Sequence, residues 1–163
     1  MLHFAYGSNM DRALMRAHAP MASPLGVAVL ADHRFITSAD GYASVEPARA
    51  HMVYGVLWQL TARDRVMLDA WENLAAGLYR ARYLPVRRPP WQRPALVYVA
   101  RVRGPGRPKP GYMELVLTAA RGWNLPPDYV ASLEIWLRAE AGGAKSIRGG
   151  TCRSEFKNRR PPP

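Results

Sequence analysis

The stretch Phe4-Ala5-Tyr6-Gly7-Ser8-Asn9-Met10 passes from an apolar run directly into a small polar turn. We expect residues 2–6 to form a short strand that ends at Gly7, with Asn9 or Asp11 as the cap of a following helix. Successive backbone N–H groups in such a turn can converge on an anion, and a helix N-terminus adds partial positive charge. The turn is therefore a candidate ligand-binding loop, although an ordinary strand-to-helix corner has the same pattern.

The remaining sequence predicts several strands with a few helices between them. Runs of β-branched and aromatic residues predict strands at 26–31, 34–37, 43–45, 51–60, 79–86 and 95–103, with a proline-rich loop at 88–94. Apolar residues three and four positions apart predict helices ending near His18, Glu72, Trp123 and Ala139. The predicted fold class is α+β: a small, mixed, largely antiparallel β-barrel-like sheet with flanking helices.

One helix start is marked by a local motif. Thr61-Ala-Arg-Asp64 resembles a capping box with aspartate in place of the usual glutamate. The helix that it opens carries Leu68 and Trp71 on its apolar side and is expected to end near Glu72.

Length and composition indicate one domain followed by a tail. At 163 residues and 48% apolar content, the chain is long enough to bury a core. From residue 142 onward the sequence is charged and without periodicity, so we expect a domain at 1–141 and a basic, disordered tail at 142–163. The single cysteine, Cys152, excludes an internal disulfide framework and indicates a reducing, cytoplasmic location. No run approaches the roughly 18 apolar residues of a membrane span, and no secretory signal is visible.

The net charge of +11 needs no nucleic-acid partner to explain it. From residue 144 onward the tail carries six basic residues and one acidic residue, and the remaining excess is spread over the body of the chain. Such a field attracts anions weakly, but a solvated basic surface is the simpler interpretation. The four histidines show no metal-ligand spacing, so we do not expect a metal site.

Glu72 is the first candidate for catalysis. A carboxylate beside Leu68 and Trp71 in the last turn of a helix has low-dielectric neighbours and faces the negative end of the helix dipole. Both effects raise the pKa of a carboxyl group toward the range of a general base near neutrality. An exposed glutamate at a frayed helix end has the same local sequence, so both interpretations stay open at this point.

A set of tyrosines and the opening turn add further candidates. Four tyrosines lie at predicted strand ends or helix starts, where their hydroxyl groups could face one cavity: Tyr6, Tyr79, Tyr98 and Tyr112. Buried tyrosines are more often core residues, so the set alone proves nothing. Ser8 is not a hydrolase nucleophile by pattern, because the sequence around it does not match Gly-x-Ser-x-Gly.

Together these segments resemble the γ-glutamylcyclotransferase-like (AIG2-like) superfamily. Residues 4–10 match its N-terminal YGSN loop, and Val53-Tyr-Gly-Val-Leu-Trp58 resembles its second strand signature. Leu68-Asp-Ala-Trp-Glu72 with Gly77-Leu-Tyr79 is similar to its LDxxEG…GxY segment, and residues 112–133 resemble its late helix pair. The resemblance covers roughly residues 2–137.

The resemblance implies a barrel-like fold and a specific reaction. The α-amine of a γ-glutamyl group would attack its own γ-carbonyl, releasing 5-oxoproline and a free amine or amino acid. Glu72 matches the catalytic glutamate, and the loop Tyr6-Gly7-Ser8-Asn9 would hold the glutamyl head with backbone N–H groups. Tyr79, Tyr98 and Tyr112 match positions that line the family's pocket. The implied partner is a small γ-glutamyl substrate, and the resemblance implies neither a metal nor an organic cofactor. From the sequence itself we expect no membrane or nucleic-acid partner, and a monomer or homodimer.

Three departures and two alternatives accompany this resemblance. Asn73 stands where the family usually has glycine, residues 38–49 lack a glycine-rich approach, and the loops at 88–94 and 104–111 are stiffened by proline. Five cations lie in or beside those loops and would suit a substrate with an extra negative charge, unless they are simply solvated: Arg87, Arg88, Arg93, Arg107 and Lys109. The alternatives are a pathway tailoring enzyme that removes a γ-glutamyl protecting group, and a non-catalytic binding protein that retains the pocket.

Overall fold

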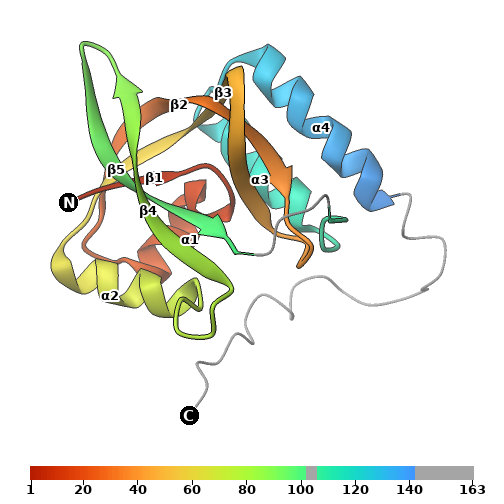
Figure 1. Cartoon of the computed structure of the whole chain (residues 1–163). Helices are drawn as coiled ribbons and strands as arrows, with labels where there is room; N and C mark the ends of the chain where they lie inside the picture. Colours follow the sequence, from red (N-terminus) through yellow and green to blue (C-terminus); the bar gives the residue numbers. More distant parts are fainter. Residues whose placement is uncertain (102–105, 142–163) are drawn as a thin grey trace.

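The computed structural model describes residues 1–101 and 106–141, and within this part five strands close into a barrel in the order β1-β3-β2-β4-β5 (Figure 1). The strands are β1 (Leu2–Ala5), β2 (Ser23–Thr37), β3 (Ala43–Gln59), β4 (Tyr79–Arg88) and β5 (Trp91–Ala100). Neighbouring strands pair antiparallel, except that β1 runs parallel to β5, where His3 pairs with Leu96. The predicted mixed, largely antiparallel barrel is confirmed.

The long hairpin β2–β3 differs from the prediction of four short strands. It contains 15 residues in β2 and 17 in β3, and the two pair almost throughout. The register shifts between Ala31 and His33, and both Asp32 and Ala50 have a positive φ. The strands therefore bend at a bulge rather than stop. Residues 46–50 are largely exposed, so the apolar pattern lapses there although the pairing continues.

The prediction of a loop at 88–94 is wrong. β4 and β5 continue to a tight turn at Pro89-Pro90, and Val86 pairs with Arg93. Proline has no backbone N–H group and cannot donate a hydrogen bond to a neighbouring strand. It is tolerated here because this end of the hairpin has a neighbouring strand on one side only over most of its length, so few hydrogen bonds of the sheet are lost. At its other end, β5 stops at Ala100, and positions 102 and 103 of the predicted strand lie outside the described residues.

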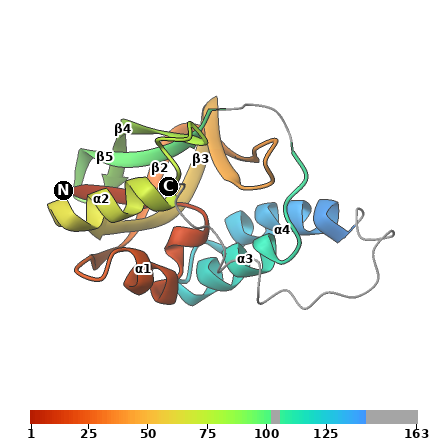
Figure 2. The same cartoon turned by 90° about the horizontal axis from the view of Figure 1, so that it is seen from below.

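Four α-helices flank the barrel, as the apolar periodicity predicted. They are α1 (Arg12–His18), α2 (Ala62–Trp71), α3 (Tyr112–Gly122) and α4 (Pro127–Ala141), and a 3₁₀ turn, η1 (Ser8–Met10), precedes α1. In Figures 1 and 2, α3 and α4 lie together on one side of the barrel, while α2 lies at one end of it. The described residues contain no helix long and apolar enough to cross a membrane. The predicted tail with Cys152 lies outside the described residues.

Two glycines let the elements around the opening turn approach closely. A Cβ on Gly55 in β3 would lie 2.2 Å from the carbonyl oxygen of Ala5 in β1. A Cβ on Gly7 would lie 2.8 Å from the Cβ of Ala43 and 2.8 Å from the hydroxyl oxygen of Tyr112. The glycines of both sequence signatures are therefore needed for packing of the protein against itself, and this packing places the end of β1 beside β3 and α3.

Candidate functional site

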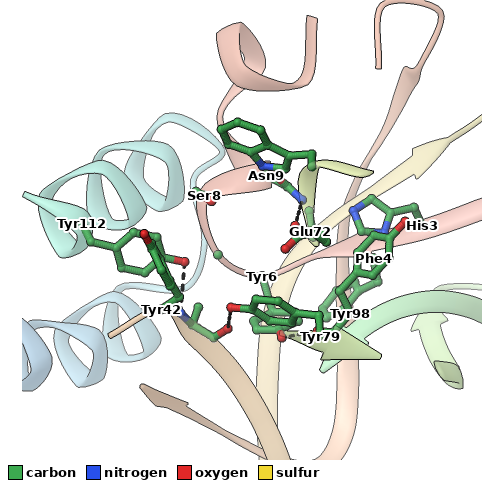
Figure 3. A pocket seen from close by; sticks show the side chains of 14 residues that line it. His3, Phe4, Tyr6, Ser8, Asn9, Tyr42, Glu72, Tyr79, Tyr98 and Tyr112 are labelled. Atoms are coloured by element: carbon green, nitrogen blue, oxygen red, sulfur yellow. Dashed lines mark hydrogen bonds between the residues drawn. The ribbon is translucent and has the colours of Figure 1, made fainter. Parts of the chain in front are cut away.

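A pocket lies where β1 ends, between the end of α2 and the start of α3 (Figure 3). Its wall contains all eight residues that the sequence singled out, and they come from the turn after β1, η1, the C-cap of α2, β4, β5 and α3. These residues are Tyr6, Gly7, Ser8, Asn9, Glu72, Tyr79, Tyr98 and Tyr112. The structure adds six that the sequence reasoning missed: His3, Phe4, Ala5, Tyr42, Ala43 and Trp71. Phe4, Ala5 and Trp71 lie beside predicted site residues in the sequence, but periodicity alone assigns apolar residues at such positions to the core.

Glu72 caps the C-terminal end of α2, and its side chain is almost entirely buried, with 9% of the residue exposed. Its Oε1 accepts a hydrogen bond of 2.7 Å from Nδ2 of Asn9, which lies 63 positions earlier in the chain (Figure 3). A hydrogen bond to an ionised acceptor is about twice as strong as a neutral one. The structure therefore shows Glu72 as a buried carboxylate and not as an exposed glutamate at a frayed helix end.

The backbone conformation of Asn73 explains how asparagine can stand where the family usually has glycine. Asn73 has a φ of 52°, in the left-handed region that glycine adopts readily. Asparagine is one of the few other residues that tolerate this conformation. The turn that follows the site is therefore formed with asparagine in place of glycine.

The turn at residues 7–10 does not lead directly into a helix N-terminus, because the 3₁₀ turn η1 precedes α1. Asp11, rather than Asn9, is the N-cap of α1, and its carboxylate accepts from the backbone N–H groups of Ala13 and Leu14, each at 2.8 Å. These amides are therefore directed at Asp11 and not at a ligand. Residues 8–10 form η1, and the indole N–H of Trp123 donates to the carbonyl oxygen of Met10 at 2.8 Å, which ties this turn to α3.

The pocket tyrosines hydrogen-bond to the protein itself. The Tyr6 hydroxyl donates to the carbonyl oxygen of Tyr98, and the Tyr79 hydroxyl donates to the carbonyl oxygen of Ala43 at 2.8 Å. The Tyr112 hydroxyl oxygen accepts from the Ala43 N–H at 3.1 Å. Burial raises the pKa of Tyr6 well above its usual value and that of Tyr112 to about 12, and the negative charge of Glu72 adds to both effects. These hydroxyl groups stay protonated at neutral pH.

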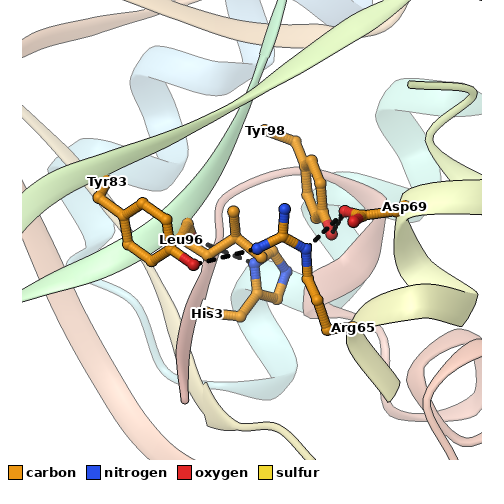
Figure 4. Close-up of polar contacts among 6 residues, drawn as sticks. All are labelled: His3, Arg65, Asp69, Tyr83, Leu96 and Tyr98. Carbon is orange, nitrogen blue, oxygen red and sulfur yellow. Dashed lines mark hydrogen bonds and ion pairs between the residues drawn. The ribbon is translucent and has the colours of Figure 1, made fainter. Parts of the chain in front are cut away.

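A polar cluster continues from the pocket wall toward the surface (Figure 4). The Tyr98 hydroxyl donates to Asp69 Oδ1 at 2.7 Å, and Nε of Arg65 donates to the same oxygen at 2.6 Å. Nη1 of Arg65 also donates to the hydroxyl oxygen of Tyr83, at 3.1 Å. The sequence analysis missed this cluster, because the spacing of Arg65 and Asp69 on α2 gives no sign that Tyr98 lies opposite them.

The five cations near the predicted loops separate into two groups. Arg87, Arg88 and Arg93 belong to the β4–β5 hairpin rather than to a loop, whereas Arg107 and Lys109 lie in the segment between β5 and α3. Lys109 contacts the pocket wall, because its Nζ lies 4.9 Å from the ring centroid of Tyr42. The segment that carries Lys109 is held to the β2–β3 turn by a backbone hydrogen bond of 3.0 Å to Gly41. Within the described residues, no group of three or more histidine, cysteine, aspartate or glutamate side chains is placed to hold a metal ion.

The barrel and its pocket define a protein of the γ-glutamylcyclotransferase-like fold. The chain is similar in structure to a γ-glutamyl cyclotransferase, with a TM-score of 0.80 and 21% identity over 96% of this chain and 95% of that one. It is equally similar to an uncharacterized protein from Homo sapiens, with a TM-score of 0.79 and 22% identity over the same shares. YkqA from Bacillus subtilis matches with a TM-score of 0.73 and 21% identity, over 85% of this chain and 54% of that one. At these identities the matches show the fold.

The chain belongs to the AIG2-like family, whose model matches residues 52–133. This segment runs from β3 to α4 and includes Glu72, Tyr79, Tyr98 and Tyr112. The resemblance inferred from the sequence motifs is thereby confirmed. A search of curated proteins found no match.

Proposed function

We propose that this protein is a γ-glutamyl cyclotransferase that releases 5-oxoproline from a γ-glutamyl amine or peptide, with Glu72 as general acid and base. The observation that carries the proposal is the buried Glu72 carboxylate, which Asn9 of the YGSN loop holds at 2.7 Å in the wall of the pocket. A buried, oriented carboxylate of this kind is suited to proton transfer.

The reaction makes modest demands on the protein. The α-nitrogen of the glutamyl group forms a bond to its own γ-carbonyl carbon, and the bond from that carbon to the leaving nitrogen breaks. Closure of a five-membered ring is fast once the chain is folded correctly, because both reacting groups belong to one molecule. The α-amine is an ammonium near neutral pH, so it first gives a proton to Glu72, and Glu72 then gives that proton to the leaving nitrogen. The attacking nitrogen loses a second proton as the ring amide forms, and the released amine takes up a proton and leaves as an ammonium.

The remaining pocket residues would bind and orient the glutamyl head. In this proposal, backbone N–H groups of the loop Tyr6-Gly7-Ser8-Asn9 contact its α-carboxylate. Asp11 already occupies the first amides of α1, so this contact depends on the turn itself rather than on the helix end. Phe4 and the tyrosine rings would exclude water from the reacting atoms, which favours proton transfer between Glu72 and the substrate.

The test is a panel of γ-glutamyl compounds incubated with the unaltered protein, with 5-oxoproline and the released amine measured by mass spectrometry. The panel should contain γ-glutamyl alkylamines, γ-glutamyl amino acids and a γ-glutamyl tripeptide. We expect equal amounts of 5-oxoproline and free amine from at least one class. If no compound yields 5-oxoproline above the rate without protein, the proposed function is wrong.

A further inference from the structure

The proton of the Tyr98 hydroxyl points toward Asp69 (Figure 4). Tyr98 lines the pocket and is 3% exposed, yet its O–H donates at 2.7 Å to Oδ1 of a carboxylate on α2. That carboxylate is ion-paired with Arg65, whose Nε lies 2.6 Å from the same oxygen. An ionised carboxylate accepts hydrogen bonds and has no proton to donate, so the direction of the bond between Tyr98 and Asp69 is fixed.

A tyrosine hydroxyl has one proton, and this fact limits what Tyr98 can offer to a ligand. With that proton committed to Asp69, the remaining lone pair of the oxygen can only accept a hydrogen bond. Burial raises the pKa of the Tyr98 hydroxyl, and so does its hydrogen bond to Asp69. The proton is therefore retained at neutral pH, and the oxygen stays a neutral acceptor.

Two further buried acceptors of the pocket wall have no hydrogen-bond partner among the described residues. Asn9 is 7% exposed, and its Nδ2 donates to Glu72, so its Oδ1 is left without a donor. Nδ1 of His3 donates to the carbonyl oxygen of Leu96 at 3.1 Å, so the unpartnered Nε2 is an acceptor. Burial lowers the pKa of His3 to about 4, which keeps the ring neutral at pH 7. Buried acceptors without a donor are unfavourable, and a ligand with several N–H groups would satisfy them.

We propose that Asp69, supported by Arg65, is a positioning residue that turns the Tyr98 proton away from the pocket, so that the Tyr98 oxygen and Asn9 Oδ1 accept N–H bonds from the substrate's α-ammonium. This inference rests on the proposed function and deepens it. An ammonium has three N–H donors and no acceptor, so it matches a wall of acceptors. Two of its N–H groups would be held by Tyr98 and Asn9, and the third would be directed at Glu72, the proposed base.

The test compares two ligands that differ only in the ammonium. One is γ-glutamyl-propylamide, and the other is its des-amino analogue, N-propyl glutaramate, which cannot cyclise and is measured as a competitive inhibitor. Asp69→Asn can present an amide N–H to Tyr98 and release the Tyr98 proton toward the pocket. We expect KM for the ammonium substrate to rise about tenfold, while Ki for the des-amino analogue changes less than about twofold. Tyr98→Phe should have a similar selective effect, and Asp69→Glu, which keeps the acceptor, should recover most of the affinity.

Matched controls separate positioning from a structural role. Asp128→Asn removes an exposed carboxylate from the first turn of α4 and should change neither constant. The double variant of Asp69→Asn with Tyr98→Phe should bind the ammonium substrate no more weakly than Tyr98→Phe alone, since both changes remove one interaction. Equal weakening of both ligands in Asp69→Asn would show a structural role only and overturn the proposal. Unchanged KM for the ammonium substrate would also overturn it.

The inference can be tested even if the proposed function is wrong. If the unaltered protein released no 5-oxoproline, the two ligands would be compared by calorimetry, which requires no turnover. If the unaltered protein binds the ammonium ligand more tightly than the des-amino ligand, and Asp69→Asn abolishes this preference, the inference is supported even then. Equal or absent binding of the two ligands to the unaltered protein would overturn it.

Discussion

The two ends of α2 each carry acidic side chains, but those side chains have different kinds of partners. At the start, Asp64 Oδ2 accepts from the N–H of Thr61 at 2.9 Å, and Thr61 Oγ1 accepts from the N–H of Asp64 at 3.2 Å. At the end, Asp69 accepts from Tyr98, 29 positions away, and Glu72 accepts from Asn9, 63 positions away. The start is closed largely by its own sequence, and the end is completed by distant parts of the chain.

This difference separates stability from function within one helix. The carboxylate of Asp64 is fully buried and satisfies backbone donors, including the N–H of Met21 at 3.0 Å, which ties the segment before β2 to α2. Asp69 and Glu72 accept from side chains that line the pocket. We therefore expect changes at the start of α2 to reduce stability with little effect on catalysis, and changes at its end to do the reverse.

The largest expected effect is that of Glu72→Gln. The amide has nearly the shape of the carboxylate but cannot take a proton, so kcat for 5-oxoproline release should fall by about 10²- to 10⁴-fold. The melting temperature should change little, which circular dichroism would check. Glu114→Gln in the first turn of α3 is the matched exposed control and should retain full activity. Undiminished turnover in Glu72→Gln would exclude Glu72 as the base.

The opposite pattern is expected for Asp64→Ala. It removes the carboxylate half of the capping box and leaves the partly buried N–H groups of Thr61 and Met21 without their acceptor, so the free energy of unfolding should fall by about 1–2 kcal/mol. Urea unfolding would measure this loss, and kcat of the folded fraction should be unchanged. Asp40→Ala, which alters an exposed turn, is the control. A large loss of kcat with unchanged stability would contradict the separation between the two ends.

The stabilising effect of Asp64 should also depend on pH. Burial by itself would raise the pKa of Asp64, but hydrogen bonds donated by Thr61 and Met21 favour the ionised form and lower the pKa below its ordinary value. A pKa that is lower in the folded than in the unfolded state stabilises the fold above the unfolded pKa of about 3.9, and this effect is lost as the pH falls through the folded value. The difference in unfolding free energy between the unaltered protein and Asp64→Asn should therefore shrink in acid. A difference that stays constant from pH 7 to pH 3 would refute this linkage.

A smaller effect on catalysis is expected for Asn9→Ala. This change removes the hydrogen bond to Glu72, so the ionised carboxylate is less favoured and its pKa should rise. We expect kcat/KM to fall about tenfold at neutral pH and the acidic limb of its pH profile to move to higher pH. Gln92→Ala, which removes an exposed amide in the β4–β5 hairpin, should leave the profile unchanged. An unshifted limb in Asn9→Ala would show that Asn9 does not set the ionisation of Glu72.

The smallest effect is expected for Lys109→Met at the pocket wall. Its ammonium lies over the ring of Tyr42 and would attract a substrate whose leaving amine carries a carboxylate. KM for a γ-glutamyl amino acid should rise about threefold relative to a γ-glutamyl alkylamine, and more so at low salt. Arg93→Met is the matched control, because Arg93 also lies over a ring, that of Trp91, but in the β4–β5 hairpin. Equal KM changes for both substrate types would remove Lys109 from substrate selection.

The sequence alone determined the local features of this protein. The capping box at Thr61 and Asp64, the helix over 112–122 and the class of the sheet could be predicted, because each depends on residue types within a few positions of one another. The sequence motifs also identified Glu72 and the YGSN loop as candidates for one site. The β4–β5 turn was missed, because prolines that normally indicate a loop are tolerated in a hairpin end paired mostly on one side.

The tertiary structure decided which groups meet and which way their protons point. Asn9 donates to Glu72 across 63 positions of the chain, and no local pattern encodes that pairing. The same holds for Tyr98, whose residue type could be recognised but whose proton is directed by Asp69. The orientation of a hydrogen bond depends on where donor and acceptor lie in space, so the acceptor character of the pocket wall is a property of the folded chain.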